Sequence, residues 1–221
     1  MPDSHLLVDK KREALRQGIL ALGTQVEKAL LASLETLRRH DLALARTIVN
    51  EDALINHERR AIEQQALVVL AAYRPAGSDL RMIGASLEMV SEMERIADYA
   101  AEVARVLLRN ANAELPESLL ERIIALGTAA VALYAESLRA YAEGADADEA
   151  RAIAAGDARI DSAEQALIDE AIAWMREHPA EARVGVALLA MGHHYERVAD
   201  RATNIAERLV YIATGETPEL D

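Results

Sequence analysis

Two carboxylate side chains four residues apart recur in this sequence. Residues 94–98 read Glu-Arg-Ile-Ala-Asp, and residues 196–200, 102 positions later, read Glu-Arg-Val-Ala-Asp. In a helix, side chains four positions apart lie on the same face, one turn from each other. Like charges at this spacing repel unless something neutralises them. The repeated pair therefore indicates a candidate cation site in each half of the chain.

A longer polar stripe extends each pair. In the second half it consists of His193, Glu196, Asp200, Asn204 and Glu207. On an ideal helix these five side chains fall within about 80° of one another, opposite the apolar Val198, Ala202, Ile205 and Leu209. In the first half the stripe holds Glu94, Asp98 and Glu102, with Ser91 in place of His193 and Arg105 in place of Glu207. Because each stripe opposes the apolar face, we expect the sites on the bundle surface.

A neighbouring helix is expected to complete each site. Asp52 and Asn56 stand four residues apart in the first half, and Asp157 and Asp161 do so in the second, followed by Glu164. Two such pairs from adjacent helices could gather about four to six oxygens around one ion. This donor set suits divalent or trivalent ions such as Mg²⁺, Mn²⁺, Fe or Zn²⁺. His193 is a candidate nitrogen ligand beside them.

Two other interpretations of the stripes stay open. An acidic stripe opposite an apolar face is typical of any solvated amphipathic helix, and Arg95 and Arg197 could neutralise part of each pair. This hypothesis makes the protein a metal-free helical adaptor. A carboxylate di-metal oxidase of the ferritin type is less favoured. That class uses Glu-x-x-His pairs that point into a four-helix core, and the expected helices contain none.

The breakers in the sequence predict an all-α fold of six helices. The helices are expected over residues 5–39, 42–73, 79–109, 117–142, 148–177 and 180–213. Asp41 is expected to cap the second helix, Ser78 or Asp79 the third, and residues 216–221 are expected to fray. The linker at residues 110–116 divides the chain into two tandem three-helix bundles, 1–112 and 113–221, related by internal duplication.

The composition limits the classes of function. Cysteine is absent, which excludes disulfides and thiolate metal sites. The net charge of −13 argues against nucleic-acid binding and adhesion to anionic lipid, and it is compatible with cations or a basic partner. We expect no membrane span, because no apolar run approaches about 20 residues, and no signal peptide. The expected compartment is the cytoplasm.

Several short motifs run through the chain in a fixed order. They are Asp41-Leu42-Ala43, Asp52 with Ile55, Arg74-Pro75, Asp79-Leu80-Arg81, residues 94–98, residues 196–200, Ala202 and residues 204–207 (Asn-Ile-Ala-Glu). With these motifs the sequence resembles the PhoU family, phosphate-signalling accessory proteins of bacteria, over nearly its whole length. Three departures stand out. Ala97 and Ala199 replace the usual glycine, Glu102 stands where asparagine is expected, and Asn56 stands where the second half has Asp161.

The resemblance implies a regulator and not an enzyme. It implies two three-helix bundles, a homodimer and multinuclear metal clusters on the bundle surface. It also implies two partners, the ATPase subunit of the phosphate ABC transporter and a PhoR-type sensor histidine kinase, with membrane contact only through them. Such proteins restrain phosphate uptake and keep the starvation response off. Carried over by motif, the metal ligands are Glu94, Asp98, Glu196 and Asp200, with Asn204, Asp52, Asp157 and Asp161 as additions.

Overall fold

The computed structural model describes residues 2–144 and 146–220, with side chains described from Lys10 onward. Every regular element in these residues is helical. The elements are α1 (Pro2–Arg39), α2 (Leu42–Tyr73), α3 (Ser78–Arg109), α4 (Glu117–Glu143), α5 (Ala147–Ala154), α6 (Asp157–Glu177), the 3₁₀ turn η1 (Pro179–Glu181) and α7 (Ala182–Thr214). The prediction of an all-α fold is confirmed.

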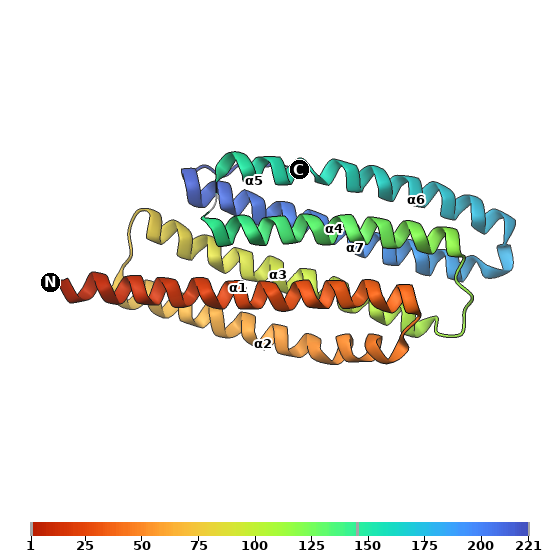
Figure 1. Ribbon diagram of the computed structural model, residues 1–221, viewed down its shortest axis with the longest axis horizontal. Coiled ribbons are helices and arrows are strands. Elements are labelled where there is room, and N and C mark those ends of the chain that lie inside the picture. Colours follow the sequence, from red (N-terminus) through yellow and green to blue (C-terminus); the bar gives the residue numbers. More distant parts are fainter. Residues whose placement is uncertain (1, 145, 221) are drawn as a thin grey trace.

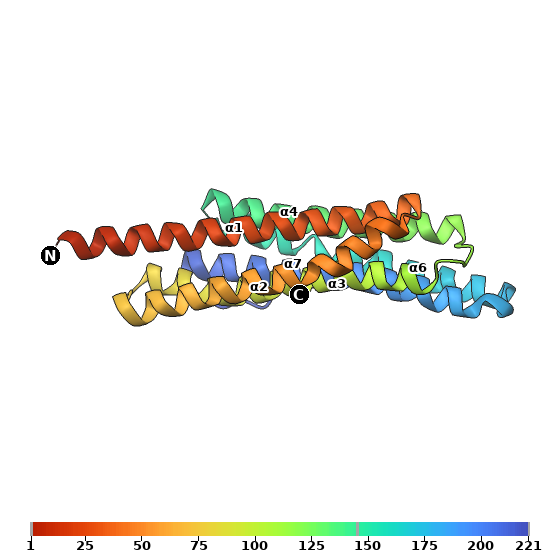
Figure 2. The same ribbon diagram turned by 90° about the horizontal axis from the view of Figure 1, so that it is seen from below.

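The long helices lie roughly parallel to one axis in two layers (Figure 1). One layer holds α1 and α4. The other holds α2, α3, α7 and then α5 with α6, in the order that Figure 1 shows, and Figure 2 shows the two layers edge-on. Thus α1 packs on α2 and α3, and α4 packs on α7, α5 and α6. The first unit (α1 to α3) and the second (α4 to α7) meet mainly through α3 and α7, so the stripe-bearing helices lie at the centre of the second layer.

The apolar faces expected from the helical wheel form the core. On α7, Val198, Ala202, Ile205 and Leu209 are all fully buried. Ile96, Ala100 and Val103 of α3 are buried in the same way. Polar groups also anchor the two units to each other, because Tyr195 of α7 shares a 2.9 Å hydrogen bond with Ser33 of α1. The Tyr134 hydroxyl of α4 donates to the Gly23 carbonyl oxygen of α1 at 3.1 Å.

Most helix boundaries agree with the sequence. Asp41 caps α2 as expected, since its Oδ1 accepts from the backbone N–H groups of Ala43 and Leu44 at 3.0 and 2.9 Å. The expected side-chain cap of α3 was wrong: Gly77 occupies the cap position with φ of 60°, and α3 begins at Ser78 without a side-chain hydrogen bond. Positive φ is a conformation that glycine adopts readily, so the backbone turns into α3 there without a capping side chain.

The single helix expected over residues 148–177 is two helices. Ala155 and Gly156 keep right-handed backbone torsions, but the Gly156 N–H donates to the Ile153 carbonyl oxygen, which interrupts the α-helical hydrogen-bond pattern and separates α5 from α6. A Cβ atom at Gly156 would lie 2.9 Å from Leu133 of α4 and 3.0 Å from the Ile153 carbonyl oxygen. The break therefore brings backbone close to α4, where a larger residue would clash. It also makes Asp157 the first residue of α6.

The expectation of a frayed C-terminal tail was wrong for the described residues 216–220. After the left-handed cap at Gly215, the tail turns back along α7. The Leu220 backbone N–H donates to Oε1 of Glu207 at 2.9 Å, and the Leu220 side chain packs against the core. Satisfied backbone groups and apolar burial hold a terminal segment that composition alone would leave loose. Asp221 lies outside the described residues.

Whether a helix is long and apolar enough on average to cross a membrane bears on the expectation of no membrane span. By length and composition α4 passes that criterion, with 44% of its most apolar window buried. One such helix is weak evidence for a span, because a core helix has the same composition. In this fold Leu119, Ile123 and Tyr134 of α4 are buried against neighbouring helices, which accounts for its apolar character.

Two helical glycines make a test of this packing. A Cβ at Gly127 of α4 would lie 2.8 Å from Leu34 and 2.9 Å from the Tyr195 ring, whereas a Cβ at Gly84 of α3 meets nothing within 4 Å. Replacing either by alanine gains about 0.8–1 kcal/mol of helix propensity. We expect Gly127→Ala to be less stable than Gly84→Ala by about 1–3 kcal/mol, because the core is overpacked. Urea unfolding of both variants measures the difference, and equal stabilities would contradict the packing described here.

Candidate metal centre

The structure brings the acidic side chains of the second repeat together across α6 and α7. Two groups form, in each of which the ligand atoms lie within 4.8 Å of one another. Glu164, His193 and Glu196 make the first group, and Asp157, Asp161 and Asp200 make the second. Five of these six residues were expected from the sequence as ligands. Glu164, noted as following Asp161 by three residues, is the addition that the tertiary structure makes.

Glu196 lies at the centre of the first group. His193 Nδ1 is 3.0 Å from Oε1 of Glu164 and 3.2 Å from Oε2 of Glu196. The Glu196 side chain is only 13% exposed, and its buried Oε2 receives no hydrogen bond. Burial, followed by repulsion from Asp200 and Glu164, raises the pKa of Glu196 from 4.5 to about 7. The site therefore holds more negative charge than its own residues neutralise.

The second group sits one turn further along the same two helices. Asp157 is buried at the first turn of α6, whereas Asp161 is exposed. Asp200 forms an ion pair with Arg197 on its own helix, so the partial neutralisation by Arg197 that the sequence suggested is present. Carboxylate oxygens with one imidazole are a hard to borderline donor set, which suits Fe, Mn²⁺ or Zn²⁺. The residues of the second repeat thus fit a metal ion by donor type and by position.

Two members of the second stripe lie apart from these groups. The Asn204 amide donates to Oε2 of Glu92 on α3 at 3.2 Å, so it contacts the other repeat. Glu207 is buried, at 7% exposure, and accepts from the tail. The prediction that the stripe faces outward was therefore wrong for Glu207, because the tail and α3 cover that end of α7.

In the first repeat, arginine side chains lie among the carboxylates. Arg59 of α2 pairs with Glu63, and its Nε is 3.8 Å from Oε1 of Glu94. Arg105 of α3 lies 3.5 Å from Oδ2 of Asp52 and 2.8 Å from Oε1 of Glu102. No group of three converging ligands was found in the described part of this repeat. The prediction that Glu94, Asp98, Glu102 and Asp52 bind metal stays a prediction.

Repulsion between carboxylates also persists in the first repeat. Burial, then the charges of Asp52 and Glu94, raise the pKa of Asp98 from 3.8 to about 6. The Arg105 guanidinium opposes this shift. Both repeats thus contain partly buried carboxylates that repel one another and have raised pKa values. They differ in the positively charged side chains that lie beside these carboxylates.

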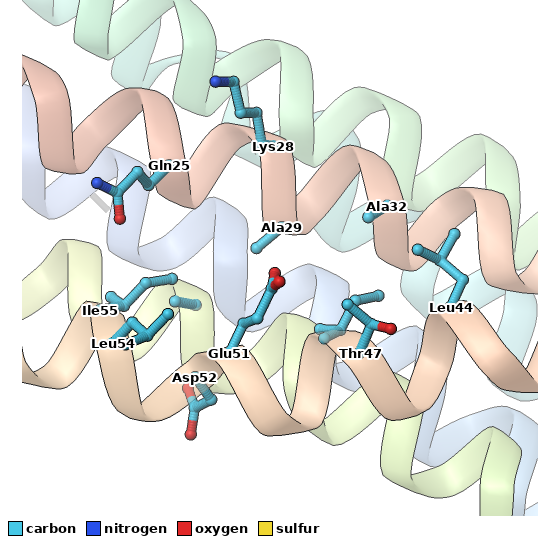
Figure 3. A pocket seen from close by; sticks show the side chains of 12 residues that line it. Gln25, Lys28, Ala29, Ala32, Leu44, Thr47, Glu51, Asp52, Leu54 and Ile55 are labelled. Atoms are coloured by element: carbon cyan, nitrogen blue, oxygen red, sulfur yellow. The ribbon is translucent and has the colours of Figure 1, made fainter.

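A groove that Asp52 helps to line opens between α1 and α2 (Figure 3). Its volume is about 280 Å³, and Ala29, Ala32, Ile48 and Ile55 give it an apolar lining. Glu51 points from α2 into this groove toward α1, whereas Asp52 points away from it. The Glu51 carboxylate therefore faces α1, whereas the Asp52 carboxylate forms an ion pair with Arg105 of α3.

Comparison with known proteins places the chain in a family. The family model described as the PhoU domain matches residues 19–107 and again residues 123–209, which together cover most of the chain. The chain belongs to the PhoU family. Each matched segment contains one Glu-Arg-x-Ala-Asp pentad, so the duplication inferred from the pentads is the PhoU repeat.

Relatives of known structure have the same fold. The chain is 33% identical to the phosphate transport system regulatory protein PhoU from Streptococcus pneumoniae, with a TM-score of 0.88 and coverage of 96% of this chain and 100% of that one. PhoU from Pseudomonas aeruginosa is 29% identical, with a TM-score of 0.90 and coverage of 94% and 99%. A homologue from Rhizobium meliloti, named phosphate-specific transport system accessory protein PhoU homolog, is 30% identical over 99% of this chain and 93% of its own.

Charge repulsion at Glu196 predicts a pH dependence in the metal-free protein. Its folded pKa lies near 7, above the ordinary 4.5. As the pH rises from about 4.5 to 7, the unfolded chain loses this proton and the folded chain keeps it, so Glu196 lowers stability progressively over that window. Glu196→Gln removes the effect.

We therefore expect the melting temperature of Glu196→Gln to rise relative to wild type between pH 4.5 and 7, by about 2 °C or more. Thermal unfolding in chelator at several pH values measures it. Glu177→Gln, at the exposed C-terminal end of α6, is the matched control and should show no such trend. A constant difference between Glu196→Gln and wild type across this range would contradict the electrostatic assignment.

Proposed function

We propose that this PhoU-family chain is a cytoplasmic regulator of phosphate homeostasis that negatively modulates high-affinity uptake and phosphate-starvation signalling. The supporting observation is similarity over nearly the whole chain, both repeats included, to proteins named accessory or regulatory proteins of phosphate transport. A homologue from Streptococcus pneumoniae with that name is 33% identical over 96% of this chain and 98% of its own length. We propose a non-enzymatic role.

The regulator acts by docking. Its partners are the ATPase subunit of the phosphate ABC transporter and a PhoR-type sensor histidine kinase, and it reaches the membrane only through them. The net charge of −13 supports docking onto basic partner surfaces, because complementary charge speeds association and selects partners. We further propose that the chain forms a homodimer.

The acidic surface also binds metal. The second repeat offers the better set, since its six side chains converge in two groups. Glu164 of α6 with His193 and Glu196 of α7 would hold an Fe, Mn²⁺ or Zn²⁺ ion in the first group, and Asp157 and Asp161 of α6 with Asp200 of α7 would hold one in the second. A bound ion would supply positive charge between the two helices and would favour the ionised form of Glu196, whose pKa is raised in its absence.

A metal-free adaptor is the second candidate, supported by one observation. Arg197 already pairs with Asp200, and Arg59 and Arg105 already pair with carboxylates of the first repeat. In that case the stripes serve stability and docking alone. The two candidates differ in whether carboxylate substitutions change the metal content.

Deletion of the gene in its own host tests the regulatory role. With phosphate in excess, we expect the deletion to raise phosphate uptake and to switch on a starvation-responsive reporter, since the negative regulator is gone. Wild-type chain supplied in trans should restore repression. An unchanged reporter and unchanged uptake in the deletion strain would overturn the proposed function.

Elemental analysis of untagged protein purified without chelator tests the metal. We expect stoichiometric metal in wild type and none in a variant with Glu94, Asp98, Glu196 and Asp200 all replaced by alanine. Asp200→Ala alone should weaken metal retention by about tenfold or more without unfolding the bundle, because Asp200 lies at the edge of the core. A large fall in melting temperature of Asp200→Ala in metal-free buffer would instead make it a structural residue. Metal at equal content in all three proteins would favour neither stripe as its site.

A further inference from the structure

The two PhoU repeats differ at the positions that decide how the acidic stripes are neutralised. When the two repeats are aligned in sequence, Asp52 of α2 corresponds to Asp157 of α6 and Asn56 corresponds to Asp161, each pair 105 residues apart. The same offset places Arg59 opposite Glu164. On α3 and α7 the offset is 102, which places Ser91 opposite His193. The first repeat therefore has a guanidinium where the second has a carboxylate of the converging group.

In the folded structure Arg59 lies among the acidic side chains of the first stripe. Arg59 pairs with Glu63 and approaches Glu94, the counterpart of Glu196. Ser91 also approaches Glu63, with 3.5 Å between its Oγ and Oε1. Glu63 and Arg59 thus form an ion pair at the place where Glu164 and His193 converge on Glu196 in the second repeat.

A second guanidinium covers the other end of the first stripe. Arg105 of α3 contacts Asp52 of α2 and Glu102 of its own helix, and so bridges the two helices. It is 32% exposed and fixed by two carboxylates. In the second repeat the aligned residue is Glu207, which is buried and occupied by the tail.

The first stripe is accessible to ions. Glu94, Arg95, Asp98 and Tyr99 line a surface hollow of about 370 Å³ that is open to solvent. Lack of access therefore does not keep metal from the first repeat.

A guanidinium held within 4 Å of a carboxylate repels a metal ion that approaches the same oxygens. In the second repeat Arg197 has this effect on Asp200, whereas the ion pairs of Glu164 and Glu196 within the described residues are made with His193. The electrostatic difference between the repeats therefore lies in the group formed by Glu164, His193 and Glu196.

We infer that Arg59 and Arg105 are fixed cations that take the place of metal in the first repeat, so that the metal of this chain is held by the second repeat alone. The inference rests on the proposed metal binding and deepens it. The ligand class is a single-repeat set of carboxylates with one imidazole, supplied by α6 and α7. The first repeat keeps its acidic residues as an ion-pair network between α2 and α3.

Titration of the full chain with Mn²⁺ tests this assignment, with free Mn²⁺ followed by electron paramagnetic resonance. Glu196→Gln with Asp200→Asn should lose all the Mn²⁺ that wild type binds, although the stripe of the first repeat is intact. Retention of part of the bound Mn²⁺ would overturn the inference and leave the proposed metal binding standing. Absence of Mn²⁺ from wild type would overturn both.

A gain of binding gives the complementary test. In the double variant of the second repeat, Arg59→Glu with Asn56→Asp recreates the pattern of Asp161 and Glu164 in the first repeat. We expect Mn²⁺ affinity there to rise by about tenfold or more. Arg59→Gln with Arg105→Gln removes both guanidiniums without adding carboxylates, and it should also raise Mn²⁺ affinity. This variant keeps the test decisive where Arg59→Glu with Asn56→Asp folds poorly.

Two controls isolate the position from the charge. Arg60→Glu makes the same change in net charge at the next residue, which is exposed and outside the cluster, and it should leave Mn²⁺ affinity unchanged within about twofold. Arg59→Lys keeps a cation at the site and should leave the first repeat unable to bind Mn²⁺. Equal gains from Arg60→Glu and Arg59→Glu, or no gain from any removal of Arg59, would overturn the inference.

Discussion

The packing of α3 against α7 is the constraint around which the other helices are arranged. Both helices bury an apolar face completely, and small residues such as Ala100 and Ala202 on those faces allow a close approach. Because the apolar faces are buried, the carboxylate stripes lie at the sides of the α3 and α7 pair. There α2 and α6 cover them in part, so the acidic side chains are neither fully solvated nor in the core.

Half-burial is what gives the stripes their chemical character. A carboxylate in water gains hydration that α2 and α6 remove here, and repulsion between neighbours adds to the loss. The raised pKa values of Asp98 and Glu196 share this cause, with burial as the larger contribution in each. A cation relieves both effects at once. A duplicated helix pair with this geometry therefore favours a cation in each copy, whether from a side chain or from solution.

The break between α5 and α6 is a structural difference between the second repeat, which contains it, and the first repeat, which does not. α2 runs unbroken past Asp52, whereas α6 begins at Asp157 after the turn at Gly156. The first turn of a helix carries partial positive charge from its free N–H groups, which stabilises a carboxylate there by about 0.3–1 kcal/mol at exposed positions. This charge favours the buried Asp157 carboxylate at the first turn of α6, near Asp161 and Asp200.

The sequence by itself determined the duplication, the identity of the stripes and the helices other than the break between α5 and α6. Hydrophobic periodicity, Asp41 as a cap and His178-Pro179 as a stop are local signals, so they could be identified without any tertiary contact. Only the tertiary structure decided which stripe residues converge. Glu164 joins His193 and Glu196 because α6 lies beside α7, Arg59 meets Glu94 because α2 lies beside α3, and Glu207 is buried because the tail returns over it. A helical wheel describes one helix in solvent, and these contacts depend on which helices are its neighbours.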